Sequence, residues 1–169
     1  GDGSWEQWPE NARTKEWYGC VESNSYQQGW FVPHDVPGMV ELMGGQDKVI
    51  ADLTNFFEKT PDNFLWNDYY NHANEPVHHV PFLFNRLGAP WLTQKWVRHI
   101  CDKAYANKVE GIVGNEDVGQ MSAWYVLAAS GLHPVCPGDT RLEISSPVFD
   151  KIEFRLDPQY FKGGKFTIV

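Results

Sequence analysis

In the first 131 residues, apolar side chains recur every three or four positions, which is the spacing of amphipathic helices. The pattern is clearest over residues 47–59 and 91–105. Further apolar stretches cover residues 39–43, 81–87 and 121–130, and glycine or proline follows most of them. The pattern predicts helices connected by irregular loops that are rich in polar and aromatic residues.

After His133 the pattern changes to alternation. Residues 142–144 and 151–156 alternate between apolar and polar side chains, and residues 165–169 begin a third such stretch. Helices followed by strands suit part of a helical barrel, with its functional residues on the loops at one end, beside part of a β-sandwich. The sequence therefore predicts a chain that is mostly α followed by β, with a boundary between residues 132 and 133.

Two stretches are expected to lack regular structure at the N-terminal end. Residues 1–19 show no clear period and are expected to form a loop, and residues 36–38 are expected to form a turn. His34 and Asp35, just before that turn, fit a capped turn better than a catalytic pair.

Two adjacent acids, Glu116 and Asp117, lie between Gly114 and Gly119, directly before the helix expected from Met121. The glycines allow the backbone to turn tightly and to approach a ligand closely. A carboxylate just before a helix is stabilised by the free backbone N–H groups and by the helix dipole. Such a carboxylate suits a general base, a metal ligand or a plain helix cap, and the spacing alone leaves all three open.

Charge and composition exclude several classes of protein. The chain has 22 acidic residues against 14 lysines and arginines, a formal net charge of -8, and no basic run, which argues against nucleic acid as a partner. No apolar run is long enough to span a membrane. The three cysteines are widely spaced, which argues against a disulfide framework and against a zinc site.

Aromatic residues make up 15% of the chain, and eight of them are tryptophans. Most are expected in the core, where aromatic side chains dominate. Rings beside acids are also typical of carbohydrate sites, because sugars present apolar C–H faces that stack on rings and hydroxyls that need carboxylates and amides. Both interpretations stay open at this point.

Three acidic clusters lie in polar loops or at helix ends, at Glu22, at Glu75 and at Glu116-Asp117. Hydrolysis of a glycosidic bond needs two carboxyl groups, one as an acid and one as a base or nucleophile. A chain with 22 acids offers many such pairs, so a non-catalytic carbohydrate-binding module and a helical packing domain with acidic caps are the alternatives.

His78 and His79 match no zinc spacing and are more typical of hydrogen bonds to a neighbour or to a substrate hydroxyl. The oxygen-bearing residues nearby favour a hard cation such as calcium, bound between separate segments. The candidate oxygen donors are Asn74, Glu75, Glu116 and Asp117.

Several stretches together resemble one enzyme family in order and spacing. They are Val21-Glu22-Ser23-Asn24 leading to residues 30–35, the Asn74-Glu75-Pro76 segment with its two histidines, Gly114-Asn115-Glu116-Asp117-Val118-Gly119-Gln120 and the residues that follow it to Tyr125, and residues 131–138. This sequence resembles the glycoside hydrolase family 92 α-mannosidases over most of residues 17–150.

The resemblance implies an inverting, calcium-dependent exo-α-mannosidase that removes mannose from glycans, N-glycans among them. It also implies an (α/α)6 barrel packed against β-sandwich domains, with residues 1–132 as the last barrel helices and residues 133–169 as the first strands that follow. Such enzymes are several times longer. The chain is therefore expected to be a C-terminal fragment of a periplasmic or secreted enzyme, dependent on the upstream part of its parent and inactive alone.

The resemblance assigns Glu22 to the general acid and Asp117 to the general base. The setting of Glu22 among apolar and aromatic neighbours is expected to bury it partly and to keep it protonated. Two departures from the family pattern are Asn115, where many relatives carry Asp, and the residue before Glu75, where members that cut α-1,2 links often carry His. The remaining predicted site residues are Trp30, Asn74, Glu75, His78 and His79 for the substrate and Glu116 for the metal.

Overall fold

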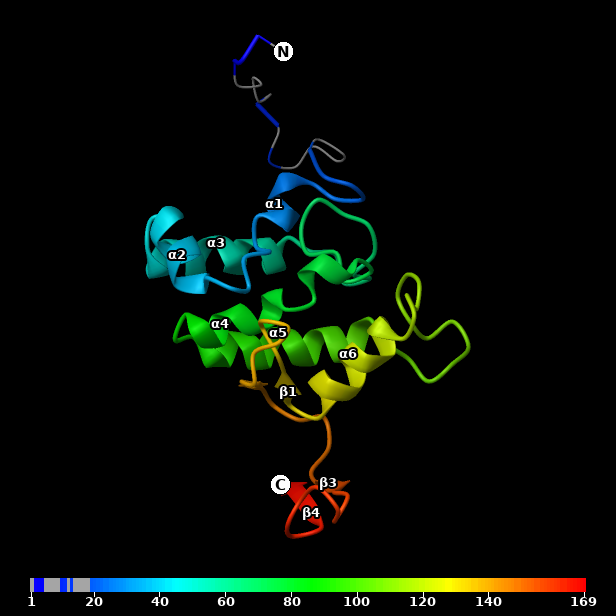
Figure 1. Ribbon diagram of the computed structural model, residues 1–169. Coiled ribbons are helices and arrows are strands. Elements are labelled where there is room, and N and C mark those ends of the chain that lie inside the picture. Colours follow the sequence, from blue (N-terminus) through cyan, green and yellow to red (C-terminus); the bar gives the residue numbers. More distant parts are fainter. Residues whose placement is uncertain (1, 5–9, 12, 14–18) are drawn as a thin grey trace.

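The structure is a computed structural model that describes residues 2–4, 10, 11, 13 and 19–169 (Figure 1). The loop expected over residues 1–19 therefore lies largely outside the described residues. In the described part the helices precede the strands, which confirms a mostly α chain followed by β. The helices are α1 Ser25–Gln28, α2 Val36–Leu42, α3 Gln46–Glu58, η1 Glu75–Val77, η2 Val80–Phe82, α4 Leu83–Arg86, α5 Pro90–Lys103 and α6 Gln120–Ala129, where η marks a 3-10 helix.

Helix α3 shows why the helical pattern was readable from the sequence. Val49, Leu53, Phe56 and Phe57 lie on one face, and each is at most 1% exposed. Phe57 stacks on Trp96 of α5, with ring centroids 5.1 Å apart. Helix α5 packs in turn against α4 and α6, so one apolar core lies between α3 and the helices drawn below it (Figure 1).

Helix α2 corrects one sequence prediction. Residues 36–38 do not form a free turn, because they are the first turn of α2. The Asp35 carboxylate accepts a hydrogen bond from the Gly38 N–H at 3.0 Å, which confirms the cap expected there. Pro37 fits because backbone N–H groups in the first turn of a helix have no intrahelical partner to lose.

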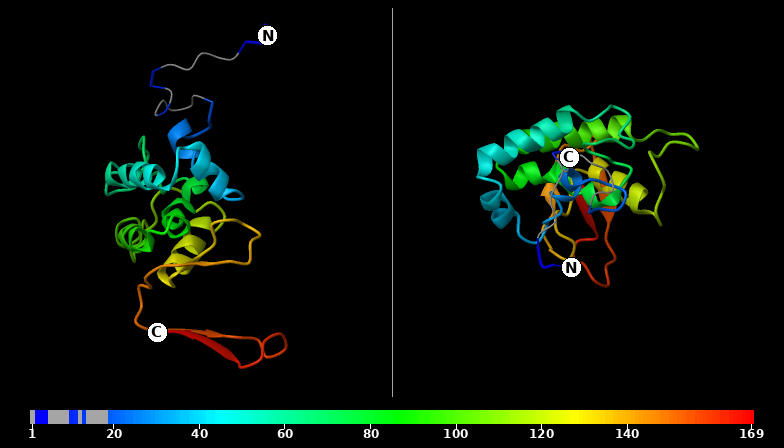
Figure 2. Two further views of the ribbon diagram at one scale, coloured as in Figure 1. Left: turned by 90° about the vertical axis from the view of Figure 1, so that its left-hand side faces the viewer. Right: turned by 90° about the horizontal axis from the view of Figure 1, so that it is seen from above.

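The strands form two small antiparallel pairs. Strands β1 (Leu132–His133) and β2 (Glu143–Ile144) pair beside α6, and β3 (Ile152–Arg155) pairs with β4 (Lys165–Ile168). The last three strands confirm the strands predicted over residues 142–144, 151–156 and 165–169, with shorter bounds, whereas β1 was not predicted. Figure 2 shows the β3–β4 hairpin standing away from the helices. The predicted domain boundary after residue 132 stays a prediction, since β1 crosses it.

In the part of the chain that the structure describes, no helix combines the length and the apolar character needed to span a bilayer.

Candidate active site

Three acidic loops from distant parts of the chain come together. Glu22 precedes α1, Glu75 opens η1, and Asp117 precedes α6. Burial raises the pKa of Glu75, and its own backbone N–H acts in the opposite direction. A hydrogen bond with the Asp117 carboxyl and the charges of Asp117 and Glu22 raise this pKa further. The Asp117 and Glu22 carboxyl groups are therefore both close enough to act on Glu75.

Strained backbone marks two of the three loops. Glu22 has a φ of 55°, Asp117 a φ of 52° and Val118 a φ of 58°, all in the left-handed region that non-glycine residues seldom adopt. Such conformations persist only where the surrounding contacts hold them.

The Glu22 loop is fixed by the polar start of α1. The Asn24 side chain accepts from the Gln27 N–H at 2.9 Å, and the Gln27 side chain accepts from the Asn24 N–H at 3.2 Å. The Gln27 amide also donates to the carbonyls of Asn67 and Tyr69. Both side chains are buried, so the polar run that an ordinary core helix would not carry serves to anchor this loop.

Glu22 itself is exposed, so the expectation of partial burial is wrong. The reason is that Tyr26 and Trp30 turn into the core, where both pack against Phe56. Val21 is 72% exposed and gives no apolar cover either.

Asn74 joins the Glu22 loop to the Glu75 segment. Its side-chain N–H donates to the Glu22 carbonyl at 3.0 Å, and Asn74 is buried. The sequence predicts Asn74 as a substrate contact, and the structure shows that one N–H of its amide makes this bond.

The two histidines after Glu75 are buried and neutral. The His78 Nε2–H donates to the His72 carbonyl at 3.0 Å, so its Nδ1 accepts from the Gln120 amide at 3.1 Å. Burial lowers the pKa of His78 to about 4 and also lowers the pKa of His79. The His79 Nε2–H donates to the Trp30 carbonyl at 3.0 Å. Among the described residues no partner is found for the His79 Nδ1, so this nitrogen can accept a hydrogen bond from a ligand.

A recess of about 240 Å³ adjoins Glu75 and is lined by both histidines, Gln120 and the Phe31 ring. Trp30 does not line it: the indole is 1% exposed, so the prediction that Trp30 rims the site is wrong. Phe31 is 50% exposed and packs edge-on to His79. Trp30 lies two residues past the end of α1 and turns into the core against Tyr26 and Phe56, whereas its neighbour Phe31 stays half exposed beside the recess.

The stretch before α6 divides two roles between its adjacent acids. The Glu116 carboxylate accepts from the Ser122 N–H at 3.0 Å and from the Ser122 hydroxyl at 2.9 Å, so it caps α6. Asp117 faces Glu75 instead. Within the described ranges, no group of three or more His, Cys, Asp or Glu residues could hold a metal ion. Calcium binding by Glu116 therefore stays a prediction.

A buried network that the sequence did not reveal ties the Glu75 segment to α6. The Tyr105 hydroxyl donates to the Met121 carbonyl at 3.1 Å, so it accepts from the His72 Nε2–H at 2.7 Å. The His72 Nδ1 then accepts from the Tyr70 hydroxyl at 2.8 Å. His72 is fully buried, which lowers its pKa well below the usual range. The network holds the start of α6, and hence Asp117, against the loop that leads to Glu75.

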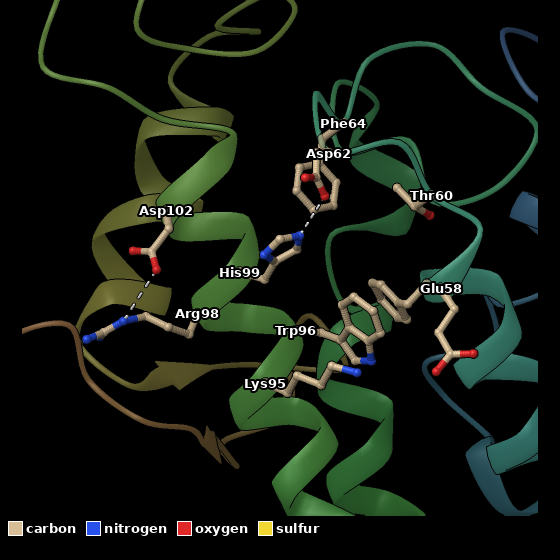
Figure 3. A pocket seen from close by; sticks show the side chains of 10 residues that line it. Glu58, Thr60, Asp62, Phe64, Lys95, Trp96, Arg98, His99 and Asp102 are labelled. Atoms are coloured by element: carbon tan, nitrogen blue, oxygen red, sulfur yellow. Dashed lines mark hydrogen bonds and ion pairs between the residues drawn. The ribbon is translucent and has the colours of Figure 1, made fainter.

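A larger recess of about 430 Å³ lies between the residues after α3 and helix α5, and none of the predicted site residues lines it. Figure 3 shows His99 joined to Asp62, 3.1 Å away, and Arg98 joined to Asp102 along α5.

The whole chain, residues 1–169, matches the model of a family described as the glycosyl hydrolase family 92 catalytic domain. The chain belongs to glycoside hydrolase family 92. Solved structures agree with this assignment. The family 92 α-mannosidase BT3965 of Bacteroides thetaiotaomicron is 36% identical, with a TM-score of 0.77 over 85% of this chain and 19% of that chain.

Two further relatives extend the comparison. The family 92 inverting mannosidase BT2199 of Bacteroides thetaiotaomicron is 34% identical, with a TM-score of 0.78 over 95% of this chain and 24% of that one. An uncharacterised secreted glycosidase of Arthroderma benhamiae is 30% identical over 79% of this chain and 16% of its own length. The chain thus spans about a fifth of the length of these relatives.

Proposed function

We propose that this chain is the part of an inverting exo-α-mannosidase that carries its catalytic carboxyl groups and acts on mannose-containing glycans, N-glycans among them. The observation that carries the proposal is the meeting of Glu22, Glu75 and Asp117 from three separate loops. The similarity to BT2199, described as an inverting mannosidase, and to BT3965, solved with mannoimidazole at 34% identity to this chain, supports the reaction class.

Asp117 is the proposed base that takes a proton from the attacking water. Burial and the neighbouring charge of Asp117 raise the pKa of Glu75, which favours a neutral Glu75 beside the proposed base. An inverting enzyme needs its acid and base roughly 6.5–9.5 Å apart, so that water fits between the base and the sugar. That separation between Glu22 and Asp117 is part of the proposal.

Glu22 is the proposed acid that protonates the leaving oxygen. Its exposed position suits contact with a substrate that enters from solvent. Glu75 is the second candidate for this role, because it is the carboxyl group whose pKa the surroundings raise. The Phe31 ring and the His79 Nδ1 are the proposed contacts to the sugar.

We also propose that the full-length enzyme binds calcium near Asp117, with ligands from this chain and from other segments. The donors near Asp117 are hard oxygens of the kind that calcium takes, but Glu116 is occupied by Ser122 and no set of three such residues forms in the described part. When bound, calcium would hold sugar hydroxyls. Removal of calcium from the full-length protein with a chelator is expected to stop turnover, and restored activity on adding Ca²⁺ checks this. Unchanged turnover in excess chelator would remove calcium from the proposal.

The remainder of the parent enzyme is a required partner in this proposal. The chain covers 16–25% of its relatives, so most of the proposed (α/α)6 barrel and β-sandwich domains would come from other segments. The isolated 169-residue chain is expected to show no mannosidase activity. A secreted or periplasmic location is proposed from the secreted Arthroderma benhamiae relative.

The test is hydrolysis of an aryl α-mannoside by the full-length protein, followed by proton NMR of the released sugar. The proposal expects β-mannose as the first product, and Asp117→Asn as an inactive control. Release of α-mannose first would exclude inversion. Binding of mannosides without hydrolysis would instead favour a non-catalytic carbohydrate-binding module.

A further inference from the structure

The Asn74 side chain binds a distant segment of the chain and does not cap the helix that it precedes. It is the residue before η1, where asparagine usually accepts a hydrogen bond from an N–H of its own helix. No such bond forms. The Asn74 Nδ2 donates instead to the Glu22 carbonyl at 3.0 Å, across 52 residues of sequence.

The acceptor of this bond is the residue with the strained backbone. Glu22 has a φ of 55°, and a non-glycine residue stays in that region only where its surroundings over-determine it. On its C-terminal side, the capping box of Asn24 and Gln27 fixes the chain. In the part of the chain that the structure describes, the hydrogen bond from the Asn74 amide is the one that ties Glu22 to another segment.

Burial of Asn74 restricts which side chains can take its place in this hydrogen bond. Asn74 is 8% exposed, so a replacement side chain cannot easily turn to solvent. A variant that lacks the amide donor at this buried position therefore leaves the Glu22 carbonyl without its hydrogen bond from the Glu75 segment. The direct neighbour of Asn74 is Glu75, so the same residue sets the spacing between two carboxyl groups of the cluster.

We propose that Asn74 is a positioning residue for Glu22. Its amide N–H holds the Glu22 carbonyl, fixes the left-handed backbone there, and so sets where the Glu22 carboxyl stands relative to Glu75 and Asp117. The role assigned to Glu22 rests on the proposed function. The hydrogen bond and the backbone conformation do not.

The first test compares leaving groups in the full-length protein. Asn74→Asp removes the donor at constant shape and points an oxygen at the Glu22 carbonyl. Its kcat on a mannose disaccharide is expected to fall about ten- to a hundredfold, and its kcat on an activated aryl mannoside by less than about threefold, with KM unchanged. Asn74→His restores an N–H donor and is expected to recover most of the disaccharide rate.

Asn85→Ala is the matched control. The Asn85 amide also donates to a distant carbonyl, that of Ile144 at 2.9 Å, and it lies outside the carboxylate cluster. Both rates are expected to stay within about twofold of wild type. An equal loss of Asn74→Asp on both substrates, or a loss confined to KM, would overturn the positioning role.

The second test does not depend on activity. In a crystal structure of full-length Asn74→Asp, Glu22 is expected to leave the positive-φ region, and in Asn74→His to keep it. An unchanged φ in Asn74→Asp would overturn the inference. If the wild type hydrolyses no mannoside, the proposed function fails and this structural test still decides the role of Asn74. If Glu22→Gln shows leaving-group selectivity and Asn74→Asp does not, the inference alone fails.

Discussion

Acidic side chains have basic partners in the recess between α3 and α5, whereas in the carboxylate cluster they lie beside one another. In the recess, Asp62 lies 3.1 Å from His99, and Asp102 lies 3.8 Å from Arg98 (Figure 3). In the cluster, no described residue forms an ion pair with Glu22, Glu75 or Asp117. The charges of Glu22 and Asp117 instead raise the pKa of Glu75. The recess beside Glu75 is also the smaller, at about 240 Å³ against 430 Å³.

The comparison teaches that unbalanced charge marks a candidate site better than the size of a hollow. Acids held together without cations destabilise the fold, so their presence calls for a functional explanation. Backbone strain alone does not separate the two regions. Phe64, which lines the larger recess, also has a positive φ of 52°, but it is a buried ring in a turn that its N–H closes onto Pro61.

The largest effect is expected from Asp117→Asn in the full-length protein. The amide cannot take a proton from water, so kcat should fall at least about a thousandfold on every mannoside, good leaving groups included. Steady-state rates on activated and unactivated substrates measure this. Asp62→Asn in the larger recess is the matched control and should stay near wild type. A loss of similar size in Asp62→Asn would reverse the comparison between the two regions.

A smaller and selective effect is expected from Glu22→Gln. The rate on a mannose disaccharide should fall about a hundredfold, whereas an activated aryl mannoside, whose phenolate leaves with little protonation, should lose far less. Glu75→Gln in parallel decides between the two acid candidates. If the selective loss appears in Glu75→Gln and not in Glu22→Gln, Glu75 is the acid. If Asp117→Asn shows it, the acid and base roles are reversed.

The buried histidines predict a dependence of stability on pH. Burial lowers the pKa of His78 and of His133 to about 4, below the ordinary value of 6.5. Between these values the unfolded chain binds protons that the folded chain does not, so stability present above pH 6.5 is lost as the pH falls toward 4. Each histidine contributes up to about 1.4 kcal/mol per pH unit in that range.

Hydrogen exchange of peptides from α6 and β1, corrected for intrinsic rates, checks this in the full-length protein. His133→Phe keeps a ring that can stack on Phe82, as the imidazole does at 4.5 Å, and removes one titrating group. Its protection should therefore fall less between pH 7 and pH 5 than that of wild type. His34→Gln, at an exposed position, should follow wild type. Equal slopes in His133→Phe and wild type would contradict the prediction.

The smallest effect is expected from His99→Gln in the larger recess. The His99–Asp62 pair is partly exposed, and such pairs stabilise proteins by about 1 kcal/mol or less. Thermal unfolding should shift by a few degrees at most, with turnover unchanged. A large loss of turnover would show that the carboxylate cluster is not the site of chemistry.

The sequence alone determined the family and most of the helices and strands, although not β1. The apolar faces of α3 and α5 were readable because helical periodicity is a local property, and so were the Asp35 cap and the strands β3 and β4. The acidic motifs were readable because their order along the chain matches the family. The boundaries of α2 were less clear, because proline and glycine at its start are equally compatible with a turn.

Only the tertiary structure decided which side chains of those motifs face one another. Trp30 and Phe31 are adjacent in sequence, but packing buries the first and exposes the second. Glu116 and Asp117 are adjacent too, and the position of Ser122 on α6 assigns the cap to one and leaves the other to face Glu75. The Asn74 bond to Glu22 and the His72 network join segments far apart in the chain. No local pattern encodes such contacts, because they depend on how the helices pack.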